Sequence, residues 1–492
     1  MGDSPIKPRR GALVTYGIAQ SLLSLLFLVL SLLQPSETGR AVFLGQSWQR
    51  LTVSSFLLVA WIASAGLVIL LLRRSGFEAS LARRFQAGLH LPALGCALLL
   101  ILCGAALLIP NALNGVTAID GYLEGLQPLA GWLLLSGCTL AATALALGET
   151  GRAGEALGFV LIVSICVLGM LGHVRLWPRS EDRNDDIYFT YLEGDRLLHG
   201  ENPYARILLG DMRENEKYAT YLPLFYYLSA GTQLLGFSQY SQWLGLWRIL
   251  LLLAGSWIAV CLFHSSWASR LRLFAVVAAL FWLFNRWTLH VSISADLDFL
   301  PLALLLTAWS LLGKRPRVAL VVLGASIAIK HYGVFLTPLF LMHVWRTSPD
   351  PKARIWKDLL LLGSVPLIAS LPFLLLDPEA FVKSILFSVS RNPMATGDVF
   401  SLDALLGWSG WAARIPMLGL LVLIYVAVWR GRLGAYASSL LVMATVTFFN
   451  SVFFTSYMVW VMPFVPLACL EAFPRAFVAG DSPGGPPHGD RA

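Results

Sequence analysis

Two adjacent carboxylates, Asp185 and Asp186, lie in the most polar segment of a chain that is otherwise rich in apolar residues. A carboxylate close to an acceptor hydroxyl can remove the proton of that hydroxyl as a general base. Tyr188 follows Asp186 closely, and a second aromatic stretch, "YATYLPLFYY", follows the segment. The pair is therefore a candidate for proton transfer, and we prefer Asp186 slightly because it is nearer to Tyr188.

A purely structural interpretation of the same residues is also open. Asn184 or Asp185 can cap the N-terminus of a helix, where a carboxylate is favourable, and Gly200 would end that helix. Thr190 and Glu193 would point away from its apolar face. That face would carry Tyr188, Tyr191, Leu192 and Leu198. This pattern predicts an amphipathic helix on the membrane surface.

Further ionisable residues lie at the ends of apolar segments. Lys330 separates two short segments, 317–330 and 332–346, and non-helical backbone at membrane depth needs a cover of protein or a watery cavity. An intramembrane lysine is a functional candidate, although it can also extend its charge to the interface. Asp296 and Asp298 either orient a substrate or cap the helix 297–312.

The apolar segments decide the class of protein. The chain is 57% hydrophobic and only 13% charged, against about 25% charged residues in soluble domains. A spanning helix needs roughly 20 apolar residues. About fourteen segments come close: 12–33, 51–72, 91–110, 127–147, 156–176, 241–262, 271–290, 297–312, 317–330, 332–346, 357–376, 411–429, 435–450 and 454–472. We therefore expect an all-α polytopic membrane protein.

Basic loops indicate its orientation. Arg270, Arg272 and the loop "GKRPR" fall on one face, together with the other short basic loops between the spans, if both termini are cytoplasmic. This makes 177–240 a large outer loop with interfacial helices, because 220–237 is broken by Pro223 and Gly231. The net charge of +8 reflects these loops and does not predict nucleic-acid binding. Arginine exceeds lysine, as in GC-rich bacterial genomes, so we expect a bacterial inner membrane.

Several classes of site have no signal in the sequence. The six cysteines lie inside apolar runs without metal-ligand spacing, so we expect neither a disulfide framework nor a metal site. There is no phosphate-binding glycine loop, so we expect no nucleotide cofactor. The segment 475–492 is rich in Pro and Gly and is expected to be a disordered cytoplasmic tail.

Several motifs carry a resemblance to a known family. Asp185–Asp186, Tyr188 and the run Gly200–Glu201–Asn202–Pro203–Tyr204 resemble the first outer loop of GT-C glycosyltransferases that use polyprenyl-phosphate sugars. "YLPL" (221–224), "ADLDFLPLALLLTAW" (295–309) and "ASIAIKHYGVFLTPLFL" (325–341) resemble later segments of that family. The similarity is greatest to polyprenol-phosphate-mannose-dependent mannosyltransferases and covers roughly 156–345. About four extra helices precede the acidic loop, so residues 1–150 have no role assigned and 151–474 form the catalytic module.

The resemblance implies transfer of a hexose, mannose first, from a polyprenyl-phosphate donor to a hydroxyl of a lipid or glycan acceptor on the outer face. Asp185 or Asp186 would be the base in an inverting reaction, from a β-linked donor to an α-linked product. The donor phosphate would contact Lys330 first, with Arg286 and His290 as second choices. Substrate-binding residues would be Tyr188, Asn202, Tyr204, Tyr221, Asp296, Asp298, His331 and Arg391.

Two other functions stay open. A transporter or flippase of a lipid-linked sugar would place its charges near the midplane and show internal symmetry, whereas this chain has no visible repeat. A membrane assembly subunit without chemistry of its own would tolerate replacement of both aspartates. We rank glycosyl transfer first.

Overall fold

The protein is described by a computed structural model that covers residues 152–177, 185–209, 219–268, 272–347, 351–390, 410–449 and 455–472. In these ranges the regular secondary structure is helical throughout, as predicted. The spans expected at 12–33, 51–72, 91–110 and 127–147 lie outside the described residues, as does the tail 475–492.

The helices follow the expected apolar segments closely. Their bounds are α8 (Arg152–Leu176), α9 (Asp185–Leu198), α10 (Arg206–Leu209), α11 (Leu224–Leu234), α12 (Tyr240–Ala268), α13 (Arg272–Phe284), α14 (Arg286–Ser294), α15 (Phe299–Leu312), α16 (Pro316–Ile329), the 3₁₀ helix η3 (His331–Leu336), α17 (Thr337–Thr347), α18 (Pro351–Leu376), α19 (Pro378–Ser390), α21 (Gly410–Trp429), α22 (Ala435–Phe448), the 3₁₀ helix η5 (Thr455–Trp460) and α23 (Phe464–Ala472).

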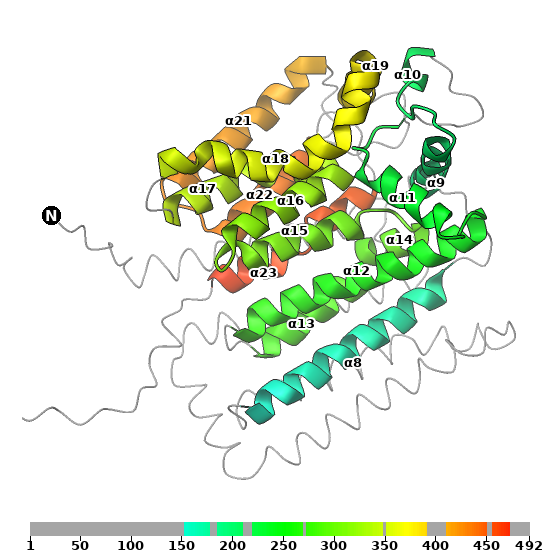
Figure 1. Cartoon of the computed structure of the whole chain (residues 1–492). Coiled ribbons are helices and arrows are strands. Elements are labelled where there is room, and N and C mark those ends of the chain that lie inside the picture. Colours follow the sequence, from blue (N-terminus) through cyan, green and yellow to red (C-terminus); the bar gives the residue numbers. More distant parts are fainter. Residues whose placement is uncertain are drawn as a thin grey trace, which may run out of the picture.

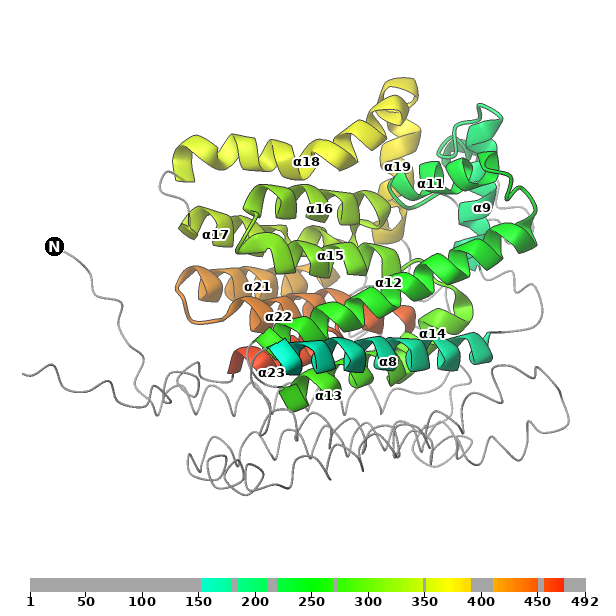
Figure 2. The ribbon, with the colours of Figure 1, turned by 60° about the horizontal axis from the view of Figure 1, so that its bottom comes forward.

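The bundle is built around α12, α15 and α16. The hairpin α15–α16 packs against α18 on one side and, through α15, against α12 on the other, and α12 packs against α13 and α8. Figures 1 and 2 show the short helices α9, α11 and α14 gathered at one end of these long helices. The turn between α15 and α16 lies at the other end, next to the start of α18 (Figures 1 and 2).

Among the described helices, two are long and apolar enough to cross a membrane: Tyr240–Ala268 and Arg354–Leu376. A third is added if Phe274–Phe284 and Trp287–Ser294 form one span with a bend of 44°. The shorter apolar helices include α15, α16, α21 and α22. Length and composition therefore make this part of the chain compatible with a membrane.

The expected span 271–290 is not one continuous helix, because Asn285 separates α13 from α14. The side chain of Asn285 accepts hydrogen bonds from the backbone N–H groups of Trp287 and Thr288, both at 3.0 Å. Asn285 is thus the N-cap of α14, where an amide oxygen satisfies otherwise unpaired donors. The break turns α14 toward η5, against which it packs.

The break predicted at Lys330 is confirmed. Lys330 has an extended backbone (φ −141°, ψ 116°), and the chain continues in the short helix η3 before α17 begins. The segment expected as one span at 332–346 is therefore a 3₁₀ turn followed by an α-helix. This geometry carries the lysine side chain inward at the end of α16.

Helix α9 ends as predicted, but its buried face was predicted wrongly. Gly200 has a φ of +77°, the left-handed conformation that favours glycine after a helix. Thr190 and Glu193, expected to point away, are each only 1% exposed, while Leu198 is 38% exposed. Glu193 tolerates burial because Arg196 pairs with it at 2.6 Å. A close contact between Gly194 and Ser229 sets α9 against α11.

Candidate active site

Asp186 lies at the start of α9, half-buried, beside the loop that precedes α11. The hydroxyl of Tyr221 donates a hydrogen bond of 2.9 Å to Asp186 Oδ2. Burial, followed by the negative charge of Asp186, raises the pKa of Tyr221 well above its ordinary value, so this hydroxyl stays protonated and keeps donating. The contact fixes the orientation of one of the two predicted carboxylates.

Lys330 lies over the aromatic ring of Tyr221. Its Nζ is 5.2 Å from the centroid of the Tyr221 ring and 5.1 Å from that of Tyr457. Asp298 Oδ1 accepts a hydrogen bond of 2.7 Å from this ammonium group. A lysine between two tyrosine rings and a carboxylate is held by cation–π attraction and a charge-assisted bond.

Two structural interpretations of these charges are wrong. Lys330 is 3% exposed, so its ammonium does not extend to the interface. The side chain of Asp298 makes no capping hydrogen bond at the start of α15. Instead it binds Lys330 and accepts a second bond from Trp460 Nε1. The physical reason is that a buried charge is stable only with a partner of opposite sign and hydrogen bonds.

Asp296 is a third carboxylate of this cluster and is 6% exposed. It lies in the link between α14 and α15, outside both helices. Burial raises its pKa to about 7, and the negative charges of Asp186 and Asp298 act in the same direction. Three acids and one lysine thus meet at one end of the bundle.

Two aromatic members of the cluster were not predicted. Tyr457 and Trp460 come from η5, close to the C-terminal end of the described chain, and both pack against Tyr332, with ring centroids 5.2 and 5.3 Å apart. In the sequence they belong to an apolar run, 454–472, in which aromatic residues are indistinguishable from ordinary core. Only the fold shows that the ring of Tyr457 contacts Lys330 and that Trp460 binds Asp298, the partner of Lys330.

Asn202 and Tyr204 hold the Tyr221 loop in place. The side-chain oxygen of Asn202 accepts a hydrogen bond from the Tyr204 backbone N–H at 3.1 Å, which closes a tight turn. Tyr204 is fully buried, packs edge-on against Phe373 and Phe381, and donates its hydroxyl to the Tyr221 backbone carbonyl at 2.8 Å. The Asn-Pro-Tyr motif therefore positions Tyr221.

The remaining predicted residues are placed as follows. Tyr188 packs edge-on against Tyr240 with ring centroids 5.0 Å apart, in an aromatic group with Tyr191. His290 is half-buried on α14, and His331 is half-buried next to Lys330. Arg286 begins α14 and Asp185 begins α9, but their side chains lie outside the described part of the structure. Arg391 lies outside the described residues altogether.

The carboxylates do not form a typical metal site. Within the described ranges, no group of three or more His, Cys, Asp or Glu side chains is arranged to hold a metal ion. Asp298 instead pairs with Lys330, and Asp186 accepts a hydrogen bond from Tyr221. The cluster is thus a network of acids balanced by a fixed ammonium group.

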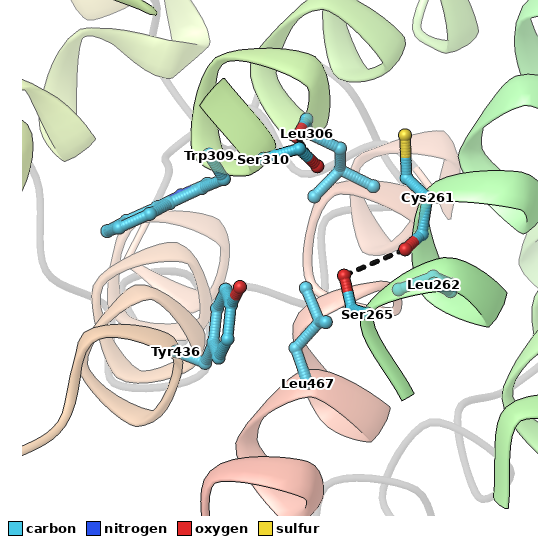
Figure 3. A pocket seen from close by; sticks show the side chains of 8 residues that line it. All are labelled: Cys261, Leu262, Ser265, Leu306, Trp309, Ser310, Tyr436 and Leu467. Atoms are coloured by element: carbon cyan, nitrogen blue, oxygen red, sulfur yellow. Dashed lines mark hydrogen bonds between the residues drawn. The ribbon is translucent and has the colours of Figure 1, made fainter. Parts of the chain in front are cut away.

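A small cavity lies near the C-terminal end of α15, whereas the cluster lies at the start of that helix. Figure 3 shows the side chains that line this cavity. The cavity measures about 10 Å³ and is lined by Cys261, Leu262, Ser265, Leu306, Trp309, Ser310, Tyr436 and Leu467. Ser265 already donates its hydroxyl to the Cys261 carbonyl at 2.8 Å (Figure 3). This volume is about that needed by one water molecule, so we treat the cavity as a packing gap.

The cluster joins segments that are far apart in the sequence: the start of α9, the Tyr221 loop, the α14–α15 link, the end of α16, and η5. The first four are the segments that carry the sequence resemblance, and the structure brings them together. No family model matches the sequence, and no curated protein is significantly similar to it.

Proposed function

We propose that this protein is a multi-pass membrane glycosyltransferase of the GT-C type, which moves a hexose, mannose first, from a polyprenyl phosphate to a hydroxyl acceptor. The observation that carries the proposal is Tyr221, which touches both Asp186 and Lys330. A general base and a fixed positive charge, each in contact with this one side chain, are the two groups that this reaction needs.

Asp186 is the base. It takes the proton of the acceptor hydroxyl while the hydroxyl oxygen forms a bond to the anomeric carbon of the sugar. The bond between that carbon and the phosphate oxygen breaks, and the polyprenyl phosphate leaves with the electron pair. Attack opposite the phosphate inverts the anomeric configuration. The bond from Tyr221 holds the carboxylate in one orientation, which lowers the entropic cost of alignment.

Lys330 supplies positive charge next to the ring of Tyr221. Because the ammonium group is buried and bound to Asp298, we assign it a positioning and electrostatic role in place of the direct phosphate contact expected from the sequence. A fixed cation in a poorly solvated site stabilises charge that develops nearby without reorganising. Arg286 and His290 on α14 are then the candidates for direct contact with the phosphate.

The placement of charges favours an orientation across the membrane. The acidic cluster lies at the start of α15 and the end of α16, while Arg315 and Arg317 lie around the turn between these two helices. Basic residues favour the cytoplasmic side. The proposed reaction therefore takes place at the outer face of a bacterial inner membrane, where a lipid donor and a lipid or glycan acceptor can both approach.

The test is sugar transfer in isolated membranes supplied with radiolabelled polyprenyl-phosphate-mannose. We expect transfer by the wild type and a loss of at least a hundredfold in Asp186→Asn, since a general base contributes roughly 10²–10⁴-fold. Asp185→Asn tests the neighbouring carboxylate. Asp195→Asn is the matched control, because Asp195 lies on the same helix and pairs with His199 away from the cluster.

Each outcome has a distinct meaning. If Asp186→Asn and Asp185→Asn both keep full activity at matched expression, the assignment of the base is wrong. If the wild type transfers no label but moves the intact labelled lipid across the membrane, the protein is a flippase. Loss of activity in Asp195→Asn as well would indicate a folding defect of α9 in place of a catalytic effect.

A further inference from the structure

At the end of the bundle opposite the acidic cluster, three arginines line a surface cavity of about 280 Å³. The cavity lies between the start of α16 and the start of α18, and its lining residues are Arg315, Pro316, Arg317, Val318 and Arg354. Arg315 and Arg317 are exposed, and Arg354 is half-buried. None of these residues belongs to the proposed active site.

The packing of the two helices explains why a cavity forms there. A Cβ atom at Gly324 would overlap the Leu362 carbonyl oxygen, so the backbones of α16 and α18 are in close contact at that point. About two turns toward the starts of both helices, the side chains are bulky arginines. Pro316 at the first position of α16 directs the chain into the α15–α16 turn. The cavity is lined by these arginines at the starts of the two helices.

The cavity has the electrostatic properties of an anion site. Three guanidinium groups line it, and among the described ion pairs one of them, that of Arg354, lies 3.5 Å from a carboxylate, Asp358. The N-terminus of α16, which begins at Pro316, adds the positive end of a helix dipole. Arginine in this arrangement suits phosphate, which it can bind through two parallel hydrogen bonds.

The residues around the cavity indicate whether it binds a free phosphate ion or the phosphate of a lipid. On α18, next to Arg354, Trp356 is 73% exposed and Leu360 is 65% exposed, and Val318 at the cavity is 46% exposed. The rest of α18 continues as an apolar surface, because only 22% of its most apolar stretch is buried in the protein. A free phosphate ion would leave this apolar surface uncovered, whereas the acyl chains of a lipid would cover it. Tryptophan is also typical of the membrane interface.

We propose that the cavity lined by Arg315, Arg317 and Arg354 binds the headgroup phosphate of an anionic phospholipid from the cytoplasmic leaflet, with its acyl chains along α18. Basic cavities between membrane helices on the cytoplasmic side are known to take such headgroups. The inference uses the membrane orientation proposed above but not the chemistry of the acidic cluster, so sugar transfer can fail while lipid binding holds.

The experiment uses the purified full-length protein in a neutral detergent. It is titrated separately with dioleoyl phosphatidylglycerol, dioleoyl phosphatidylcholine and inorganic phosphate, and native mass spectrometry counts the molecules retained. The cavity variant is Arg315→Gln/Arg317→Gln, whose two side chains are exposed and whose loss leaves the Arg354–Asp358 pair intact. The matched control is Arg430→Gln/Arg432→Gln, which removes two exposed arginines from the loop between α21 and α22.

We expect the wild type and the control variant to retain phosphatidylglycerol in preference to phosphatidylcholine, and the cavity variant to bind it roughly tenfold more weakly. Equal loss in the cavity and control variants would show general attraction to basic loops and overturn the proposal. Displacement of phosphatidylglycerol by millimolar inorganic phosphate would also overturn it, because the site would then select free phosphate. Equal retention of phosphatidylcholine would do the same.

Discussion

Tyr221 connects the two charged halves of the cluster, since its hydroxyl contacts Asp186 and its ring contacts Lys330. The sequence predicted both of these partners as functional residues, together with Asp296 and Asp298. It did not predict the pairing of Asp298 with Lys330, because 32 residues separate them and no local pattern records such a contact. It also missed Tyr457 and Trp460, whose aromatic side chains are common in any apolar core.

The Lys330–Asp298 pair predicts a specific pattern of stability. Removing one member leaves the other as an uncompensated buried charge, which costs about 3–5 kcal/mol. We therefore expect Lys330→Met and Asp298→Asn each to lower the thermal stability of the detergent-solubilised protein strongly, and the double variant to recover part of that loss. Thermal unfolding of all four proteins measures the coupling. A double variant that loses the full sum of both single effects would contradict the pairing.

Asp296 predicts how stability depends on pH. Its pKa in the folded protein is about 7, above its ordinary value of 3.8, so the folded state binds a proton more tightly than the unfolded state. The resulting stabilisation is complete below about pH 4 and is lost as pH rises to about 7. Asp296→Asn keeps a neutral side chain throughout.

Thermal unfolding of the wild type and Asp296→Asn, measured from pH 4 to pH 8 in the same detergent, checks this expectation. The wild type should lose stability relative to the variant as pH rises to about 7, and the difference should then stay level. A difference that is constant over the whole range would show that Asp296 does not titrate in the folded protein as described.

At the scale of helices, the sequence predicted where each helix begins and ends better than it predicted which face of the helix is buried. The bounds of α8, α12, α15, α16 and α18 follow the apolar segments, because hydrophobic length alone identifies them. The buried face of α9 was predicted wrongly, since Glu193 is buried with Arg196 as its partner. The break at Asn285 had a signal in the sequence, an N-cap residue inside an apolar run, whereas the contact of Gly324 with α18 had none.

Gly324 predicts that the packing of α16 on α18 is sensitive to a single methyl group. In Gly324→Ala the new Cβ atom would overlap the Leu362 carbonyl oxygen, so the two backbones must move apart at a cost of about 1–3 kcal/mol. Gly419 is an exposed helical glycine on α21 with open space around it. Gly419→Ala is therefore the control and should be neutral or stabilising.

Thermal unfolding in detergent gives the comparison directly. A lower melting temperature for Gly324→Ala with an unchanged or higher one for Gly419→Ala is the expected result. If both substitutions have the same effect, close contact between α16 and α18 is not what makes Gly324 necessary.

At the scale of the whole molecule, the α15–α16 hairpin links the acidic cluster to the arginine cavity. The acids meet at one end of α15 and α16, and the arginine cavity lies at the other end. Fourteen residues of α-helix span about 21 Å, so one hairpin carries both sites on opposite sides. The composition predicted a membrane protein, and the basic loops predicted its orientation. Neither could show that the acidic cluster and the arginine cavity are carried by the same pair of helices.

This arrangement predicts which ends of the molecule are reachable from outside the cell. Gln239 is exposed between α11 and α12, at the end of the bundle that holds the acidic cluster, and Lys314 is exposed in the α15–α16 turn. The described cysteines, Cys166, Cys261 and Cys469, are all buried, and labelling of the wild type gives the background. In intact cells, a membrane-impermeant maleimide should label Gln239→Cys and leave Lys314→Cys unlabelled.

After permeabilisation both should react, which shows that Lys314→Cys was protected by the membrane and not by the fold. Labelling of Lys314→Cys but not Gln239→Cys in intact cells would invert the orientation, and the acidic cluster would then face the cytoplasm, where a polyprenyl-phosphate sugar on the outer leaflet cannot reach it.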